Sequence, residues 1–172
     1  AVLLSTLDNL YFISDIRSVE DEFPDDLDVC WNSALMYNWL KRLKPIQFML
    51  KFRCPWFAAK STLAGLTTDK QETFRDCSEI DFIKLFKEKR FMYIKPDVIW
   101  LQAFAPRAST ETRLVGSSLD VIEYDIAEYE QKLAWFNDTH RQYNNIQNSY
   151  MNSIKCFNKR NDCSLAVSIF DD

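Results

Sequence analysis

One pattern constrains the fold of this chain more than any other: two apolar runs flank an amphipathic segment within residues 10–52. The runs 10–13 and 46–52 are short and rich in aromatic or aliphatic residues, which is typical of strands buried on both faces. The segment between them, about 26–44, has apolar residues at helical spacing, acidic residues at its start and Pro45 after its end. Strand, helix and strand at this spacing predict a βαβ unit with parallel strands and an α/β fold.

Further along the chain the patterns predict shorter elements. We expect a loop over 58–69, a short helix from 81 to about 89 capped through Ser78-x-x-Asp81, and a strand over 98–104. Residues 113–115 resume an apolar pattern that suits an antiparallel neighbour, and 125 to about 158 is predicted to be helical. The final run, 165–170, suits either a helix or a strand. The length of 172 residues predicts a single domain over 1–172.

Composition excludes several kinds of site. The chain has only two glycines, Gly65 and Gly116, so neither of the common glycine-rich phosphate-binding loops is present. Five dispersed cysteines without C-x-x-C spacing argue against a disulfide framework or a metal site, and suit a reducing compartment. The single histidine, His140, lies among polar residues and removes most histidine-based mechanisms. No apolar run approaches the ~20 residues that a membrane span needs, so we expect no membrane partner.

Charge gives a more local signal. The net charge of -4 argues against a protein that binds nucleic acid through overall basicity, but it leaves room for a local basic groove. Asp15 follows the first predicted strand, Lys51 lies near the end of the second, and Glu111 follows the third. Ligands of open α/β sheets bind at the carboxyl ends of the strands, so these side chains are predicted to converge. A desolvated lysine oriented by carboxylates can accept a proton from an alcohol, although salt bridges at strand ends also serve purely structural purposes.

Four segments carry a resemblance to a known family: FISDIRS (12–18), LKFRCPW (50–56), QAFAPRASTETRL (102–114) and DIAEYEQK (125–132). They resemble, in order and at compatible spacing, motifs of the FtsJ-like cap-specific mRNA (nucleoside-2′-O-)methyltransferases, above all the poxvirus enzymes that double as a poly(A) polymerase subunit. The likeness covers about 10–132 and suggests a large cytoplasmic DNA virus as the source, with the protein in the host cytoplasm, viral factory or virion. It implies the C-terminal half of a Rossmann-like fold, with a mostly parallel sheet, an antiparallel last strand and C-terminal helices.

The resemblance also implies residue roles. The family uses a Lys-Asp-Lys-Glu tetrad, and Asp15, Lys51 and Glu111 match its last three members. Lys51 would be the general base for a ribose 2′-hydroxyl, and the methyl group would come from S-adenosylmethionine, with Asp15 and Ile16 on the cofactor side. The remaining matches are positions that contact RNA in the family, namely Arg17, Arg53, Ser109 and Arg113, and positions that bind the methylated guanine of the cap, namely Trp56 and Glu130.

The chain also departs from the family pattern. Ala58 and Ala108 stand where the relatives have a carboxylate and a tyrosine of the cap pocket, so cap recognition is expected to be altered. The first lysine of the tetrad and the glycine-rich cofactor loop are missing, and we expect an N-terminal half, upstream or on another chain, to supply them. Without the resemblance, Trp56 would suit a core position, Arg53 a structural salt bridge and Glu130 a solvated helix position.

Two functions therefore remain open. The first is an RNA cap 2′-O-methyltransferase that acts on capped mRNA, with the N-terminal half and a viral poly(A) polymerase or capping enzyme as the expected protein partners. The second is a catalytically inactive methyltransferase-like module that binds RNA or scaffolds a transcription and capping complex. This alternative stays open because a protein can keep a fold after it has lost the activity.

Overall fold

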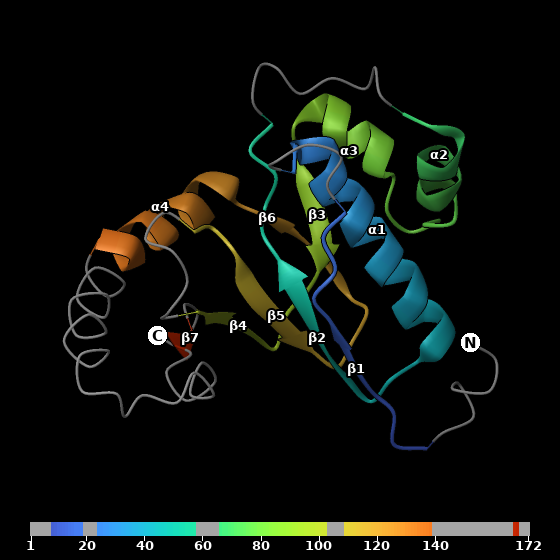
Figure 1. Ribbon diagram of the computed structural model, residues 1–172, viewed down its shortest axis with the longest axis horizontal. Helices are drawn as coiled ribbons and strands as arrows, with labels where there is room; N and C mark the ends of the chain where they lie inside the picture. Colours follow the sequence, from blue (N-terminus) through green and yellow to red (C-terminus); the bar gives the residue numbers. More distant parts are fainter. Residues whose placement is uncertain (1–7, 19–23, 58–65, 103–108, 139–166, 169–172) are drawn as a thin grey trace, which may run out of the picture.

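The computed structural model describes residues 8–18, 24–57, 66–102, 109–138 and 167–168 (Figure 1). Within these ranges a five-stranded sheet, a separate two-stranded sheet and four α-helices form a mixed α/β structure, which confirms the α/β part of the predicted fold class. The elements follow one another as β1 (Tyr11–Ser14), α1 (Asp26–Leu43), β2 (Gln47–Phe52), α2 (Thr68–Arg75), α3 (Phe82–Glu88), β3 (Phe91–Ile94), β4 (Val98–Leu101), β5 (Thr112–Gly116), β6 (Val121–Tyr124), α4 (Ile126–Phe136) and β7 (Val167–Ser168).

The βαβ unit predicted at the start of the chain is confirmed. Strands β1 and β2 are parallel neighbours, and α1 connects them. A capping box begins α1: the Asp25 side chain accepts a hydrogen bond from the backbone N–H of Asp28, and the Asp28 side chain accepts one from that of Asp25. The helix ends at Lys44 in the left-handed conformation, one residue before Pro45. Local sequence signals therefore set both ends of α1.

The main sheet is mixed, with the strand order β1-β2-β5-β4-β7. Strands β1, β2 and β4 run in one direction, and β5 lies antiparallel between β2 and β4. The antiparallel neighbour predicted over 113–115 is thus present, although β1 and β2 form the only pair of parallel neighbours among the described strands. Because β5 runs antiparallel to β2, the beginning of β5 lies beside the end of β2, with Thr112 opposite Phe52.

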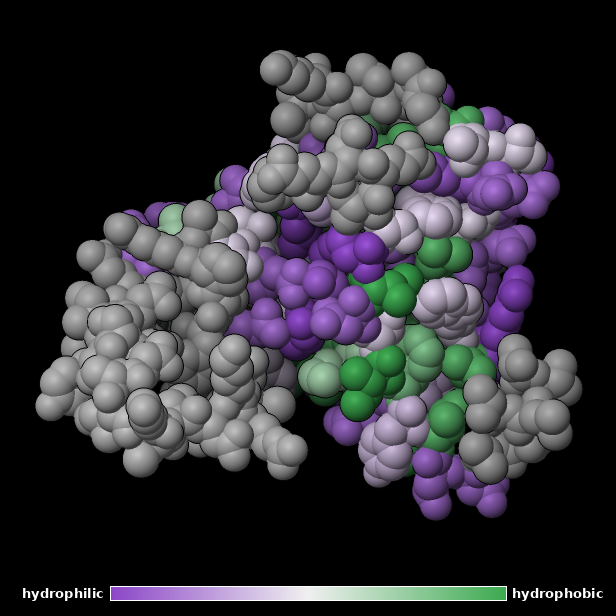
Figure 2. Space-filling model, viewed as in Figure 1, coloured by the Kyte–Doolittle hydropathy of each residue, from purple (hydrophilic) through white to green (hydrophobic). Residues whose placement is uncertain are grey.

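The expectation that the first strand is buried on both faces is wrong. Tyr11 and Ile13 are 63% and 69% exposed, whereas Phe12 on the opposite face packs edge-on against Trp39 of α1. Within the described residues β1 pairs only with β2, so it forms an edge of the sheet with one uncovered face. Figure 2 shows hydrophobic side chains gathered over β1, next to a strongly hydrophilic region near the strand ends.

The core of the domain contains an aromatic cluster around Phe52 of β2. Its ring lies 5.1–6.1 Å from the rings of four aromatic residues. These partners come from the two-stranded β3–β6 sheet and from α4: Phe91, Tyr93, Tyr124 and Tyr129. The sequence analysis did not identify β3 or β6, and it is the packing of their aromatic residues against β2 that fixes their place.

Two further expectations need correction. Helix α2 begins at Thr68, inside the predicted loop 58–69, and a buried Lys70–Asp28 ion pair of 3.1 Å connects it to α1. The short helix over 82–88 is confirmed, but its N-cap is Asp81, whose side chain accepts from the backbone N–H of Lys84, and not Ser78. The predicted strand 98–104 is described as far as residue 102 and ends at 101, and the later parts of the helix expected over 125–158, with His140, lie outside the described residues.

The sequence analysis expected neither a disulfide framework nor a membrane span, and the described cysteines and helices are relevant to both. Cys30, Cys54 and Cys77 are buried free thiols, and burial raises the pKa of Cys77 to about 12, so this thiol is protonated at neutral pH. Cys156 and Cys163 lie outside the described residues. Among the helices that the structure describes, none combines the length and the apolar character needed to cross a membrane.

Gly116 at the end of β5 provides a test of this packing. It lies directly opposite Phe48 of β2, and a Cβ atom at position 116 would approach Phe48 Cζ to 2.7 Å. We predict that Gly116→Ala lowers the free energy of unfolding by about 1–3 kcal/mol, because the buried ring must move aside. Urea denaturation measures this. Combining the change with Phe48→Leu should cost less than the sum of the two single changes, and strict additivity would contradict the proposed overlap.

Candidate functional site

An ion cluster joins the three residues that the sequence analysis placed at strand ends. Lys51 Nζ lies 3.3 Å from Asp15 Oδ1 and 2.9 Å from Glu111 Oε2. The Lys51 side chain is only 17% exposed, so the ammonium group is held mainly by these carboxylates and not by water. The structure thus brings together the lysine and the two carboxylates that the proton-transfer hypothesis requires.

The strand order explains why these residues meet. Asp15 directly follows β1 and Lys51 is the penultimate residue of β2, and the two strands are parallel, so both side chains lie at the same edge. Glu111 was expected after the end of a third strand, but it directly precedes β5. Because β5 is antiparallel to β2, its beginning reaches the edge where β2 ends. Glu111 therefore reaches the expected edge of the sheet through the start of an antiparallel strand and not through the end of a parallel one.

Arg113 is the fourth member of this cluster. Its Nη1 lies 2.6 Å from Glu111 Oε1, and its Nη2 lies 3.0 Å from Asp15 Oδ1. Arg113 was predicted to contact RNA, but here its guanidinium binds both carboxylates that also bind Lys51. We call these four residues, Asp15, Lys51, Glu111 and Arg113, the strand-end cluster.

The electrostatics of Glu111 reflect this arrangement. Burial by itself raises the pKa of Glu111, but hydrogen bonds from Arg113 and Lys51 outweigh burial and hold the pKa below its usual value. The backbone N–H of Glu111 also donates to Ser109 Oγ at 3.2 Å. Ser109, predicted to contact RNA, therefore contacts the residue that carries a catalytic role in the hypothesis.

A second group of predicted residues surrounds Asp26, in the first turn of α1. The backbone N–H of Trp56 donates to Asp26 Oδ1 at 2.7 Å, and the Arg53 guanidinium lies 4.6 Å from the centre of the Trp56 ring. Trp56 is 50% exposed, which excludes the alternative that it is a core residue. The backbone of Trp56 is thus fixed by Asp26, and its side chain is half exposed with Arg53 over the ring.

Arg53 and Glu130 are predicted site residues that border the same region. Arg53 donates to the Pro24 carbonyl at 3.0 Å and lies 4.0 Å from Asp26, so a structural role is compatible with its contacts, but its buried Nε has no partner. Glu130 of α4 is half-buried, and burial, followed by the negative charge of Asp26, raises its pKa. The group around Asp26 therefore includes both residues predicted to bind the cap.

Arg17 and Ile16 follow the end of β1. Both are half-buried, and Ile16 packs against the core. Burial lowers the pKa of Arg17 most strongly, followed by the positive charge of Arg53, while the carboxylates of Glu111 and Asp15 act in the opposite direction. Arg17 therefore lies close enough to the strand-end cluster and to Arg53 to link the two groups electrostatically.

Two residues that the sequence analysis missed hold the site segments in place. The completely buried Asn32 of α1 accepts a hydrogen bond from the backbone N–H of Ser18, which fixes the segment after β1. Tyr129 of α4 bonds Thr110 O at 3.0 Å and Thr112 Oγ1 at 3.1 Å, on both sides of Glu111. In the sequence Tyr129 is only one of several apolar positions on its helix, so no local signal distinguishes it.

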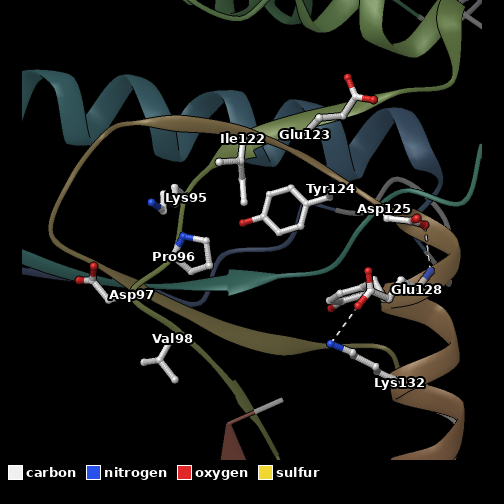
Figure 3. Close-up of a pocket in the computed structure, with 11 residues that line it drawn as sticks. Lys95, Pro96, Asp97, Val98, Ile122, Glu123, Tyr124, Asp125, Glu128 and Lys132 are labelled. Atoms are coloured by element: carbon white, nitrogen blue, oxygen red, sulfur yellow. Dashed lines mark hydrogen bonds and ion pairs between the residues drawn. The ribbon is translucent and has the colours of Figure 1, made fainter. Parts of the chain in front are cut away.

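A pocket of about 340 Å³ has Tyr129 among its lining residues (Figure 3). It is bordered by residues 95–98, by β6 and by the first turns of α4, and the Tyr124 ring faces into it. At its rim Lys132 and Glu128 form an ion pair of 3.0 Å. Its walls include none of the predicted site residues, so the pocket is separate from the strand-end cluster.

Neither a search for metal-binding groups nor the comparisons with known proteins assign a further role to these residues. No group of His, Cys, Asp and Glu among the described residues has the arrangement to hold a metal ion. Ala58 and Ala108, the two departures from the family's cap pocket, lie outside the described residues. No sequence profile of a known protein family matches the chain, and no curated protein matches it significantly.

The lowered pKa of Glu111 predicts a dependence of stability on pH. A carboxylate whose pKa is lower in the folded state stabilises the fold above its unfolded pKa, and this contribution disappears as the pH falls through the folded pKa. We therefore predict that wild-type stability, measured by urea midpoints, falls more steeply below pH 4.5 than that of Glu111→Gln.

Glu79 offers a matched control, because it lies at an exposed position in the turn before α3 and a hydrogen bond from Lys41 lowers its pKa. We expect Glu79→Gln to change the pH dependence less, since water screens this pair. An equal effect of the two substitutions would show that the strand-end cluster does not stabilise the fold in the expected way.

Proposed function

We propose that this chain is the C-terminal part of an RNA cap 2′-O-methyltransferase, in which Lys51 is the general base. The observation that carries the proposal is the position of Lys51 Nζ within 3.3 Å of Asp15 and 2.9 Å of Glu111 at one edge of the sheet. Sequence resemblance assigns these three residues to one catalytic tetrad, and their proximity, which no local sequence signal requires, supports that assignment.

The proposed chemistry assigns a task to each member. Lys51 in its neutral form would accept the proton of a ribose 2′-hydroxyl as the ribose oxygen bonds to the methyl group, while Asp15 and Glu111 orient the lysine. The bond between the methyl group and the cofactor sulfur would break in the same step, so that the rest of the cofactor would leave as a neutral thioether. S-adenosylmethionine, when bound, supplies the methyl group. The described residues fit one side of that cofactor: Ile16 follows the strand end, and the buried Ser14 hydroxyl has no hydrogen-bond partner.

The remaining side of the cofactor site needs an N-terminal half, as the resemblance implies. The edge strand β1, with the exposed Tyr11 and Ile13, supports this part of the proposal. Sheets with parallel strands normally have both faces covered, and the apolar face at β1 is open among the described residues. We propose that the N-terminal half covers this face and completes the cofactor site.

The RNA side of the proposal rests on the group around Asp26. Arginine guanidinium groups suit phosphate oxygens, and Arg17 lies within electrostatic reach of both the strand-end cluster and Arg53. The exposed Trp56 ring offers a stacking surface for a base, and the positively charged methylguanine of a cap would add a cation–π contribution. Capped mRNA is therefore the proposed substrate.

A catalytically inactive RNA-binding module is the second candidate. The charge balance of the strand-end cluster favours it, because two cations and two carboxylates satisfy one another without a ligand. Measurement of methyl transfer decides between the two functions.

The role of Lys51 gives the first functional prediction. In the full-length protein, Lys51→Ala should reduce methyl transfer from labelled S-adenosylmethionine to short capped RNA by about 100-fold or more, the usual contribution of a general base. Binding of the same RNA should stay nearly unchanged. Lys84→Ala, which removes an exposed lysine of α3, serves as the control and should transfer methyl groups at the wild-type rate. Unchanged turnover in Lys51→Ala would refute the mechanism.

Trp56 gives the second functional prediction. Trp56→Ala should weaken binding of capped RNA by about 1–3 kcal/mol, the usual contribution of base–aromatic stacking, and should affect uncapped RNA much less. Fluorescence anisotropy with matched capped and uncapped oligonucleotides measures both affinities. Trp135→Ala, at another exposed tryptophan, is the control. Equal losses on the two RNAs would show that Trp56 does not bind the cap.

A further inference from the structure

We propose that Arg113 is a positioning residue of the strand-end cluster and not a phosphate contact: it bridges Asp15 and Glu111, so that they orient Lys51 without holding its proton too strongly. This inference rests on the proposed function and deepens it. It also replaces the RNA-binding role that the resemblance implies for Arg113.

The contacts form a closed ring of alternating charge. Asp15 Oδ1 lies 3.3 Å from Lys51 Nζ and 3.0 Å from Arg113 Nη2. Glu111 offers one oxygen to each cation, at 2.9 Å to Lys51 and 2.6 Å to Arg113. Each of the four groups therefore contacts both groups of opposite sign, and a shift of Arg113 would move both carboxylates that orient Lys51.

The hydrogen bonds of Arg113 leave it poorly placed to bind RNA. Its Nη1 donates to Glu111 Oε1 and to the Thr112 carbonyl at 3.1 Å, and its Nη2 contacts Asp15. The side chain is only 15% exposed. To reach a phosphate, Arg113 would have to give up its contact with one of the two carboxylates.

The charge count shows what Arg113 contributes to proton transfer. With Arg113 present, loss of the Lys51 proton changes the net charge of the cluster from zero to minus one. Without Arg113, the same step would change it from minus one to minus two, which is less favourable at these short distances. An arginine suits this task because its guanidinium stays protonated in proteins and has a two-armed geometry that matches two carboxylates.

The test compares Arg113→Gln and Arg113→Lys in the full-length protein. For Arg113→Gln we expect a lower kcat and a shift of the acidic limb of the pH–rate profile to higher pH by about one unit, because two carboxylates then act on Lys51 alone. Arg113→Lys restores the charge but not the bridge, so its profile should lie close to the wild-type one with kcat still reduced. Arg42→Gln, which breaks an exposed ion pair near the C-terminal end of α1, is the control and should change neither quantity.

RNA binding supplies a measurement that does not depend on turnover. A phosphate contact adds about one to the slope of log K against log salt concentration, so its removal would reduce this slope. We expect both Arg113 variants to keep the wild-type slope with capped RNA. If Arg113→Gln does not fold, the kcat of Arg113→Lys still tests the bridge, because lysine keeps the charge but lacks the two-armed geometry that matches two carboxylates.

The outcomes separate the two proposals. A reduced salt slope with an unchanged pH–rate profile would show that Arg113 binds phosphate and would overturn this inference, while leaving the proposed function intact. A wild-type protein that transfers no methyl group to capped RNA would overturn the proposed function, and the role of Arg113 with it.

Discussion

The pairing of β2 with β5 is the constraint on which the arrangement of the site depends. Its register places Lys51 directly opposite Arg113, and like charges in that position repel each other. Asp15 and Glu111 offset this repulsion, and each of them contacts both cations. The two carboxylates of the strand-end cluster therefore support this register, and removal of Glu111 would leave the little-exposed cations Lys51 and Arg113 with Asp15 as their remaining partner in the cluster.

The first two turns of α1 hold the segments that follow the two parallel strands. Asn32 fixes the segment after β1 through the backbone of Ser18, and Asp26 fixes the segment after β2 through the backbone of Trp56. Asp25 caps the same helix end. One helix terminus thus positions both the strand-end cluster and the exposed tryptophan, so the two groups of site residues are parts of a single framework.

How much the sequence predicts depends on how local the signal is. The βαβ unit follows from apolar periodicity and helix ends, and Asp15, Lys51 and Glu111 follow from charge at strand ends together with the resemblance. The exposure of Tyr11 and Ile13 does not follow from the sequence, because an apolar run does not indicate whether other elements pack against both faces of the strand. The position of a strand within its sheet is decided by pairing partners that lie far away in the sequence.

Long-range contacts account for the other differences. Helix α2 has few apolar residues, and its place depends on a buried ion pair between Lys70 and Asp28, 42 residues apart in sequence. The strands β3 and β6 are four residues each and are held by ring packing against Phe52. The contacts of Arg113 likewise depend on the register of β5, whereas the resemblance implied an RNA contact for this residue.

The geometry around Trp56 limits how selectively a cap can be recognised. Arg53 lies over the ring, so we expect a base to stack on the surface that remains open, and stacking tolerates every base because each has a π face. Selectivity for guanine then depends on groups that bond its edge. Ala58 stands where the resemblance implies one such carboxylate, and burial and Asp26 raise the pKa of Glu130, the other implied carboxylate, which disfavours its charged form. Under the proposed function, we therefore expect this framework to hold RNA beside Lys51 more readily than it distinguishes the cap guanine from other bases.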